Sequence, residues 1–326
     1  MTSLKEPPAT PASGRVAGDK FASAPPPRWW QNRGTRIALL AAGAVLFLTL
    51  ALWPVARGVS RMIMVQWWHS QAEAHVLAGD YKQAVADMDQ VIANAPNNLN
   101  HYAERARLRL EAGDFAGSLA DYEHIIKANP GHASAYTYRS QVAQRQGRYA
   151  DAVADLTKAL ELSPATEPEP WNNRAYGRAL AKVELPDALT DVERALKLFN
   201  LQKTHIPDSN SNAELLRSDD NRTEASYLDT RGYVHHLLGN QEQALADLNR
   251  AIELNKNCRK VVVAAAEKAK FSAPRLDLIR KEFDRFDAVM LHHRGLVQQA
   301  LGHEKEANAD LQWAEELGYN PAAGVE

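Results

Sequence analysis

The chain has 326 residues and carries 38 Lys and Arg against 40 Asp and Glu, for a formal charge of −2. This length allows roughly one to three domains. The near-neutral total argues against a dedicated nucleic-acid binder, which shows a clear basic excess. Cys258 is the only cysteine in the sequence, so an intramolecular disulfide framework is excluded.

The chain begins with a basic, proline-rich tail, residues 1–36. Six of the 16 prolines fall within the first 27 residues, among alanine, serine, glycine and threonine. Such a segment cannot bury enough apolar surface to offset the entropy lost on ordering, so we predict that it is disordered. It holds six Lys and Arg against two Asp and Glu, a charge of +4, which leaves −6 for the rest of the chain.

Residues 37–56 form an uncharged apolar run, IALLAAGAVLFLTLALWPVA. A helix rising about 1.5 Å per residue needs about 20 such residues to cross a hydrocarbon core of ~30 Å. Trp29 and Trp30 precede the run and Trp53 lies near its end, where membrane-interface aromatics are expected. A cleaved signal peptide and a buried soluble helix are the alternatives. The long preceding tail and the length of the run favour a transmembrane helix in the lipid bilayer.

Positive residues on the two sides of the run predict its orientation. The more basic flank stays in the cytoplasm. We therefore expect a single-pass membrane protein with a cytoplasmic N-terminus and the rest of the chain on the other side of the membrane. The flanking residues are Lys20, Arg28, Arg33 and Arg36 ahead of the run, and Arg57 and Arg61 behind it.

Beyond the run, glycines and prolines recur every 34 residues. A fixed period of this length is typical of stacked helix-turn-helix units, each of which buries its second face against the next. Glycine suits the left-handed residue that ends a helix and proline cannot continue one, so the two mark the turn and the end of a unit. The residues on this period are Gly79, Gly113 and Gly147, and Pro96, Pro130 and Pro164.

The units resemble tetratricopeptide (TPR) repeats over most of residues 65–321. A large residue early in the first helix, a small residue one turn later and a small residue in the second helix carry the resemblance. It implies an all-α fold, a TPR-like helix-turn-helix solenoid of about six repeats after one N-terminal transmembrane helix. The residues are Trp68, Tyr102, Tyr136, Trp171, Leu228 and Leu291; Ala72, Ala106, Ser140, Ala175, Gly232 and Gly295; and Ala84, Ser118, Ala152, Ala188, Ala244 and Ala307.

The array is predicted to cover residues 60–321 with two insertions. The first, 201–224, is polar and is predicted to be a loop. In the second, 259–287, a breaker at Ser272-Ala273-Pro274 precedes apolar residues at helical spacing. This pattern predicts a helix from about 274 to 301, paired with a lengthened second helix of the fifth repeat in a hairpin that stands out from the array. The repeats are predicted at 65–98, 99–132, 133–166, 168–200, 225–258 and 288–321. The fourth has Lys182-Val183-Glu184 in place of the glycine turn, with one extra residue.

Two columns of opposite charge run through the repeats. An arginine precedes the small residue of the first helix in five repeats, and all six repeats carry aspartate at one position of the second helix. A guanidinium can meet a carboxylate with two hydrogen bonds. We therefore predict an ion-pair ladder that fixes the register of the helices, and an arginine row for an acidic ligand is the alternative. The columns are Arg105, Arg139, Arg174, Arg231 and Arg294, and Asp87, Asp121, Asp155, Asp191, Asp247 and Asp310.

The second helix of the last repeat is polar where earlier repeats are aliphatic. The positions that face the following unit hold Val85 and Ile92 in the first repeat but Asn308 and Glu315 in the last. A terminal repeat requires a polar outer face. The array is therefore predicted to end near Pro321.

No motif in the sequence predicts catalysis, a cofactor or a metal site, so we expect that the chain is not an enzyme. We find no phosphate-binding glycine loop and no nucleophile elbow. The pairs His235-His236 and His292-His293 are adjacent, and adjacent helical residues do not face each other. Cys258 is expected to be a packed or idle thiol.

By resemblance to the family, the first helices of the repeats line a concave groove that takes an extended peptide. The family's Lys/Asn clamp for a C-terminal carboxylate is not matched, because the equivalent places in the first repeat hold His69 and Glu73. The predicted partner-binding positions are Arg107, Gln141, Arg145, Asn172, Tyr176, Asp229, Tyr233, His236 and His292.

These patterns predict a membrane-anchored protein–protein interaction scaffold. A peptide or helix of a partner protein is expected to bind in the groove, and no nucleic acid is expected. The alternative is a structural component of an envelope or secretion assembly. The chain has the look of bacterial membrane-anchored repeat proteins.

Overall fold

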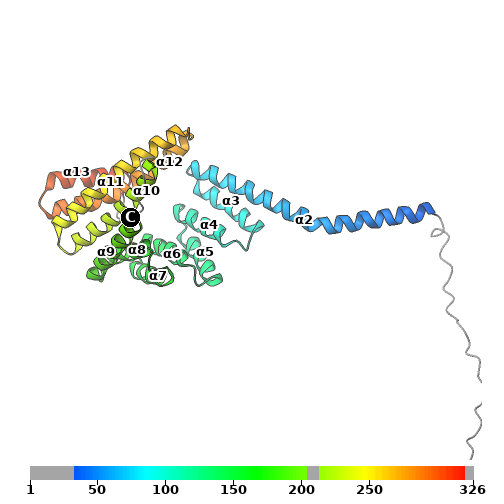
Figure 1. Cartoon of the computed structure of the whole chain (residues 1–326), viewed down its shortest axis with the longest axis horizontal. Coiled ribbons are helices and arrows are strands. Elements are labelled where there is room, and N and C mark those ends of the chain that lie inside the picture. The colour runs from blue at the N-terminus through cyan, green and yellow to red at the C-terminus, as the bar shows by residue number, and fades with distance from the viewer. Residues whose placement is uncertain (1–32, 204–212, 320–326) are drawn as a thin grey trace, which may run out of the picture. The chain divides into compact units, whose positions relative to one another are not determined.

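The computed structural model describes residues 33–203 and 213–319, and within these ranges every regular element is an α-helix. The chain divides into two compact units, Met1–Ser60 and Arg61–Glu326. The helices are α2 (Arg33–Leu77), α3 (Tyr81–Asn94), α4 (Leu99–Glu111), α5 (Phe115–Ala128), α6 (Ala133–Arg145), α7 (Tyr149–Leu162), α8 (Glu169–Ala181), α9 (Leu185–Gln202), α10 (Ala213–Leu237), α11 (Gln241–Lys268), α12 (Ala273–Ala300) and α13 (Glu304–Glu316) (Figure 1).

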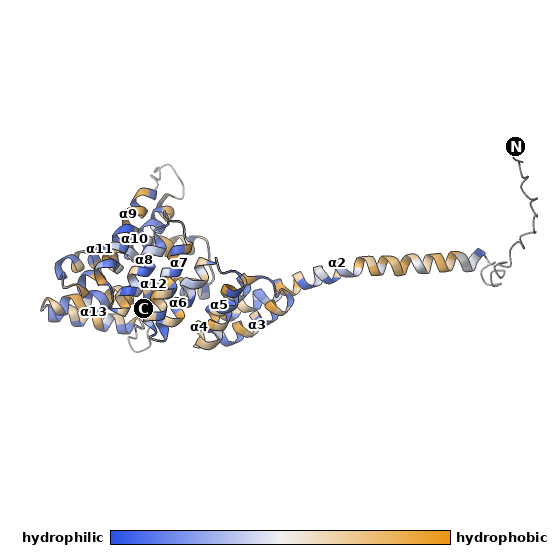
Figure 2. Ribbon diagram, turned by 90° about the horizontal axis from the view of Figure 1, so that it is seen from below, coloured by the Kyte–Doolittle hydropathy of each residue, from blue (hydrophilic) through white to orange (hydrophobic). Residues whose placement is uncertain are grey.

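The first unit contains the N-terminal part of α2. Of the predicted tail, residues 1–32 lie outside the described residues, and 33–36 belong to α2. Among the described helices, α2 is the one long and apolar enough to cross a membrane, judged by its length and composition. Hydrophobic residues predominate along its N-terminal half (Figure 2). Its large apolar side chains, from Ile37 to Val59, are exposed.

The second unit is a series of helix pairs. The last turns of α2 pack against α3 in one core cluster. The pairs α4–α5, α6–α7, α8–α9, α10–α11 and α12–α13 continue along the chain. The all-α, TPR-like solenoid predicted from the sequence is confirmed. Each pair forms one repeat and contributes one first helix and one second helix to it.

Glycine and aspartate together build the tight turn of the second repeat. Gly113 has a φ of +79°, a left-handed conformation that glycine adopts without a steric penalty. Asp114 then caps α5, because its Oδ1 accepts a hydrogen bond from the backbone N–H of Gly117 at 2.9 Å. The Gly-Asp sequence therefore ends one helix and begins the next within a few residues.

The fourth turn reaches the same geometry without glycine. Lys182 and Glu184 both have left-handed backbones, with φ of 54° and 47°. The N–H of Lys182 donates to the carbonyl of Ala179 and that of Val183 to the carbonyl of Arg178, both at 3.0 Å, so the end of α8 is hydrogen-bonded in spite of the strain. A left-handed side-chain-bearing residue costs about 1–2 kcal/mol. This turn is therefore the most strained of the array's described turns.

Lys182→Gly is expected to stabilise the chain by about 1 kcal/mol, because glycine removes the steric cost at a C-terminal left-handed position. The matched control is Lys197→Gly. Lys197 is an exposed lysine within α9, where glycine is expected to destabilise by about 1 kcal/mol. Thermal melting of the two full-length variants should therefore shift in opposite directions, and a shift of the same sign in both would contradict this account of the turn.

The predicted ion-pair ladder is confirmed. In each of five repeats the arginine of the first helix donates two hydrogen bonds, from Nε and Nη2, to the two carboxylate oxygens of the aspartate in the second helix, at 2.5–2.9 Å. The bonds join the two helices of one repeat. The partners are 16 residues apart in four repeats and 17 apart in the fourth, which confirms its extra residue.

The first repeat uses another residue for the same purpose. Its first helix carries Gln71 at the arginine position, and Asp87 instead contacts His75, whose Nδ1 lies 2.7 Å from Oδ2. His75 stands one turn after Gln71. Arg109 and Arg178 occupy the equivalent place in the second and fourth repeats, where each adds a second cation to Asp121 or Asp191.

The prediction that residues 201–224 form a loop is wrong for its C-terminal half. Residues 204–212 lie outside the described ranges, but α10 begins at Ala213, well before the fifth repeat. Ala213 and Ser218 are buried, and the Arg222 guanidinium lies over the rings of Phe283 and Phe286, at 5.4 and 5.1 Å. Packing against α12 therefore overrides the polar composition, which by itself favours a loop.

The second insertion forms the predicted helical hairpin. α11 extends to Lys268, and α12 runs antiparallel to it from Ala273 to Ala300, close to the predicted 274–301. Asp287 joins the two helices, because its carboxylate accepts hydrogen bonds from Asn255 at 2.7 Å and Arg259 at 3.1 Å. Burial raises the pKa of Asp287.

The expectation that this hairpin stands out from the array is wrong from Phe283 onward, although residues 267–275 at its free end are exposed. Phe283 is 1% exposed, and Arg285 Nη2 lies 3.2 Å from Glu111 Oε2 on α4. The apolar side chains at helical spacing give α12 a face to bury, and α10 supplies the matching surface. The hairpin therefore contacts the second repeat through Arg285.

The outer face of the last repeat is exposed where the sequence is polar. Asn308 and Glu315 on α13 are both exposed, whereas Val85 and Ile92 of the first repeat are at least partly buried against the next pair. Tyr319 is buried after α13 and contacts His292, with ring centroids 4.1 Å apart. The predicted endpoint, Pro321, lies outside the described residues.

Candidate functional site

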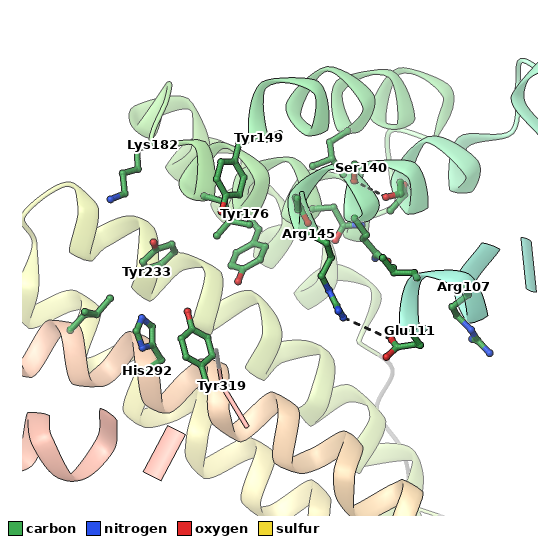
Figure 3. Close-up of a pocket in the computed structure, with 18 residues that line it drawn as sticks. Arg107, Glu111, Ser140, Arg145, Tyr149, Tyr176, Lys182, Tyr233, His292 and Tyr319 are labelled. Atoms are coloured by element: carbon green, nitrogen blue, oxygen red, sulfur yellow. Dashed lines mark hydrogen bonds and ion pairs between the residues drawn. The ribbon is translucent and has the colours of Figure 1, made fainter. Parts of the chain in front are cut away.

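The first helices of five repeats line a cavity of about 540 Å³ in the second unit (Figure 3). First-helix residues one turn apart share a face. Each of these helices therefore presents between one and five side chains to the cavity. α4 contributes Arg107 and Glu111, α6 contributes Arg145, and α8 contributes Tyr176. A second cavity of about 440 Å³ shares Arg145 and Tyr176 with the first and is also lined by residues of α10 and α12.

Eight of the nine predicted groove residues line these two cavities. His236 lines neither, because it is turned towards the next helix, where its Nδ1 lies 2.9 Å from Gln241 Oε1. The first cavity is lined by Arg107, Gln141, Arg145, Tyr176, Tyr233 and His292, and the second by Gln141, Arg145, Asn172, Tyr176 and Asp229.

The cavity walls are joined by ion pairs across the hollow. Glu111 Oε1 lies 3.9 Å from Arg145 Nη2, and its Oε2 lies 3.2 Å from Arg285 Nη2 on α12. One carboxylate on α4 thus links the third repeat to the returning hairpin. Figure 3 shows the Arg145 and Glu111 side chains pointing toward each other.

Cations outnumber carboxylates around both cavities, although the array as a whole is acidic. Arg107, Arg145 and Lys182 line the first cavity against Glu111 alone. The second has three arginines and two carboxylates, namely Arg145, Arg222 and Arg285 with Asp229 and Glu282. Low-dielectric walls that carry one sign of charge concentrate the field in a cleft, so these cavities favour an anionic ligand.

A buried histidine packs behind Tyr233, one of the aromatic residues that line the hollow. Tyr233 stacks on His293 with ring centroids 4.1 Å apart, and His293 Nδ1 lies 3.0 Å from Asp229 Oδ1. His293 is fully buried, so Asp229 acts chiefly on this packed histidine and holds the Tyr233 ring in place. Rigid aromatic surfaces of this kind provide large contact areas at low entropic cost.

Several lining residues were not predicted from the sequence. Tyr149 begins α7, and Lys182 stands in the irregular turn of the fourth repeat. Arg285 and Tyr319 come from the second insertion and the segment after α13. The repeat frame could have indicated Glu111, which lies one turn after Arg107. The place of Arg285 depends on the path of the hairpin.

The serine that lines the first cavity is hydrogen-bonded within its own helix. Ser140 Oγ donates to the backbone carbonyl of Thr137 at 2.6 Å, so its hydroxyl is already used within its own helix. Cys258 is buried elsewhere, and burial raises the pKa of its thiol, which keeps the sulfur protonated and unreactive.

Three segments of the chain match tetratricopeptide repeat models, at residues 70–98, 103–166 and 225–258. The chain therefore contains tetratricopeptide repeats, as the 34-residue period indicates. The match at 225–258 has the same bounds as the predicted fifth repeat. Among curated proteins, none matches this chain.

Several solved structures have a similar arrangement of helices. A tetratricopeptide repeat protein from Parabacteroides merdae is 15% identical, with a TM-score of 0.45, over 80% of this chain and 96% of that one. A thermophilic TPR protein from Thermus thermophilus is 16% identical, with a TM-score of 0.45, over 64% of this chain and 100% of that one. MamA from Desulfovibrio magneticus is 13% identical, with a TM-score of 0.44, over 59% of this chain and 96% of that one.

Proposed function

We propose that the chain is a membrane-anchored protein-interaction scaffold that binds an acidic peptide segment of a partner protein in the hollow of its repeat array. The segment from 37 to 56 holds the array at the bilayer, with the N-terminal tail in the cytoplasm and the array on the other side. The observation that carries this proposal is the convergence of first-helix side chains from successive repeats on one hollow.

The size of the hollow supports a peptide as the ligand. The two cavities, of about 540 and 440 Å³, share Gln141, Arg145 and Tyr176 and so form a continuous row of sites rather than a single closed pocket. An extended segment can place successive side chains in such a row. The tyrosines that line the cavities can make apolar contacts with the peptide, and the amide of Gln141 can hydrogen-bond to its backbone.

The charge of the hollow supports an acidic segment. Arg107 is exposed, and Lys182 is exposed at the opposite rim of the first cavity. Arg145 lies between them and is only loosely paired, at 3.9 Å from Glu111. A carboxylate on a ligand can displace this long contact and form a bidentate bond to the guanidinium.

The test measures the binding of labelled peptide pools to the full-length chain in detergent micelles by fluorescence anisotropy. Asp/Glu-rich pools are expected to bind more tightly than Lys/Arg-rich pools of the same length. Arg145→Glu combined with Tyr176→Ala is expected to weaken acidic binding by about 30-fold or more, because buried Arg and Tyr contacts are each worth ~2 kcal/mol at an interface centre.

The matched control combines Arg250→Glu with Tyr138→Ala, which changes the same residue types at exposed places outside both cavities. It should leave peptide affinity unchanged. Equal losses in the two double variants would contradict binding in the hollow. If the chain is instead a structural part of an envelope or secretion assembly, neither pool binds and both variants remain in the same crosslinked membrane complexes.

A further inference from the structure

Three potential metal ligands from the first two repeats lie close together, outside both cavities of the hollow. His69 on α2 and His101 and Glu104 on α4 place their ligand atoms within 4.8 Å of one another. His69 Nε2 lies 2.8 Å from Glu104 Oε2, and His101 Nδ1 lies 3.9 Å from the same oxygen. His101 and Glu104 share one face of α4 because they are three residues apart.

His101 has a buried ring nitrogen, Nδ1, on the side of the other two ligands. Its side chain is 12% exposed, and its buried Nδ1 has no hydrogen-bond partner. An unpartnered ring nitrogen in such a place costs free energy. A cation bound at Nδ1 would remove this cost.

We propose that His69, His101 and Glu104 bind a divalent cation of the zinc class, with water as the fourth ligand. Two imidazoles and one carboxylate with an open fourth position form an established tetrahedral zinc environment. This site is independent of the proposed peptide-binding function. It would join the first helices of the first and second repeats.

Binding needs only a small rearrangement of the side chains. In a tetrahedral site, zinc–ligand bonds of about 2.0–2.2 Å place any two ligand atoms roughly 3.3–3.6 Å apart. The three ligand atoms are within 4.8 Å. His69 and Glu104 are 37% and 40% exposed, so these two have room to turn toward the more buried His101.

Asn98 is the residue that should tune this site. Its Oδ1 caps α4 by accepting from the N–H of Asn100 at 3.1 Å, which leaves its amide nitrogen 3.0 Å from His101 Nε2. A metal at Nδ1 requires a proton on Nε2, and this N–H would then face the N–H groups of Asn98. An aspartate at 98 would accept from both Asn100 and His101. Asn98→Asp should therefore tighten metal binding.

The experiment titrates Zn²⁺ into the chelator-treated, full-length chain in detergent micelles by calorimetry, and Co²⁺ by visible absorption. One equivalent of Zn²⁺ is expected, with tetrahedral bands for Co²⁺. Glu104→Gln and His101→Gln should each weaken Zn²⁺ binding by at least 10-fold, and Asn98→Asp should strengthen it by about 10-fold, as outer-shell partners of ligating histidines do. Far-UV circular dichroism checks that each variant remains helical.

The double variant His303→Gln with Glu306→Gln is the control. These exposed residues have the same three-residue spacing at the start of α13, but no third ligand accompanies them among the described residues. Its Zn²⁺ affinity should equal that of the unmodified chain. The proposal is overturned by an equal loss in this control, by octahedral Co²⁺ spectra, by an Asn98→Asp variant that binds no more tightly, or by the absence of saturable binding. The Glu104 side chain is partly exposed, so Glu104→Gln is expected to fold. Its Zn²⁺ affinity therefore tests the site even if His101→Gln fails to fold.

Discussion

Arg231→Leu is expected to destabilise the array by about 3 kcal/mol, because it leaves a largely buried carboxylate without its cation. Arg231 donates from Nε and Nη2 to the two oxygens of Asp247, each at 2.7 Å. The Asp247 side chain is 12% exposed, so water cannot replace both bonds. His235 lies one turn further along α10, and burial is the main cause that lowers its pKa and so disfavours its charged form.

Two other arginine variants separate this effect from a general loss of charge. Arg107 is exposed on α4, so Arg107→Leu is expected to change stability by less than about 0.5 kcal/mol. Arg174→Leu should fall between the two, because Arg178 Nη1 remains 2.5 Å from Asp191 Oδ2. Thermal melting of the full-length variants gives the order, and hydrogen exchange in α10 and α11 gives its location. Equal melting temperatures for the Arg231 and Arg107 variants would contradict the ladder's stabilising role.

The repeat frame made the fold predictable from the sequence. The 34-residue period, the turn residues and the small residues at the helix contacts are all signals that lie within a single repeat. They therefore predict a repeat without information about residues elsewhere in the chain. Gly232 illustrates this point. A Cβ there would lie 2.8 Å from Leu248 Cγ and 3.2 Å from the carbonyl oxygen of Ala244, so the small residue reports the close approach of α10 and α11. The arginine and aspartate columns pair within one repeat for the same reason.

The sequence predictions failed at the two insertions, because the structure there depends on residues far apart in the chain. The start of α10 is polar and reads as a loop until α12 is placed beside it, because only the rings of Phe283 and Phe286 give Arg222 a surface to cover. Likewise, the contact between Arg285 and Glu111 joins residues 174 apart in the sequence. No local pattern encodes such a pair, so the direction of the hairpin was not predictable.

The candidate hollow was predicted as far as it follows the repeats. Residues such as Arg145 and Tyr176 sit at repeated first-helix positions, and both line the hollow as expected. Tyr319 follows α13, and its place beside His292 depends on how the last repeat closes. His69 and His101, 32 residues apart, lie at unrelated places in the repeat frame, so only the packing of α2 on α4 reveals their proximity.

Phe283→Ala is expected to cost about 3–5 kcal/mol of local stability, the range for deleting a buried aromatic ring. The ring is 1% exposed beneath the Arg222 guanidinium, 5.4 Å from its centroid. Its loss would leave a cavity and remove the surface on which the polar start of α10 is ordered. Hydrogen exchange should therefore accelerate over residues 213–224 and along the N-terminal half of α12, while α4 to α7 keep their protection.

Phe271→Ala is the matched control for this prediction. Phe271 is 37% exposed in the turn between α11 and α12, and Arg275 lies over its ring at 4.7 Å. Both variants thus lose an aromatic ring with a stacked arginine, but only Phe283 supports α10. The Phe271 variant should change stability by less than about 1 kcal/mol and leave residues 213–224 protected. If those residues stay protected in the Phe283 variant too, α10 is ordered by something other than its contact with the hairpin.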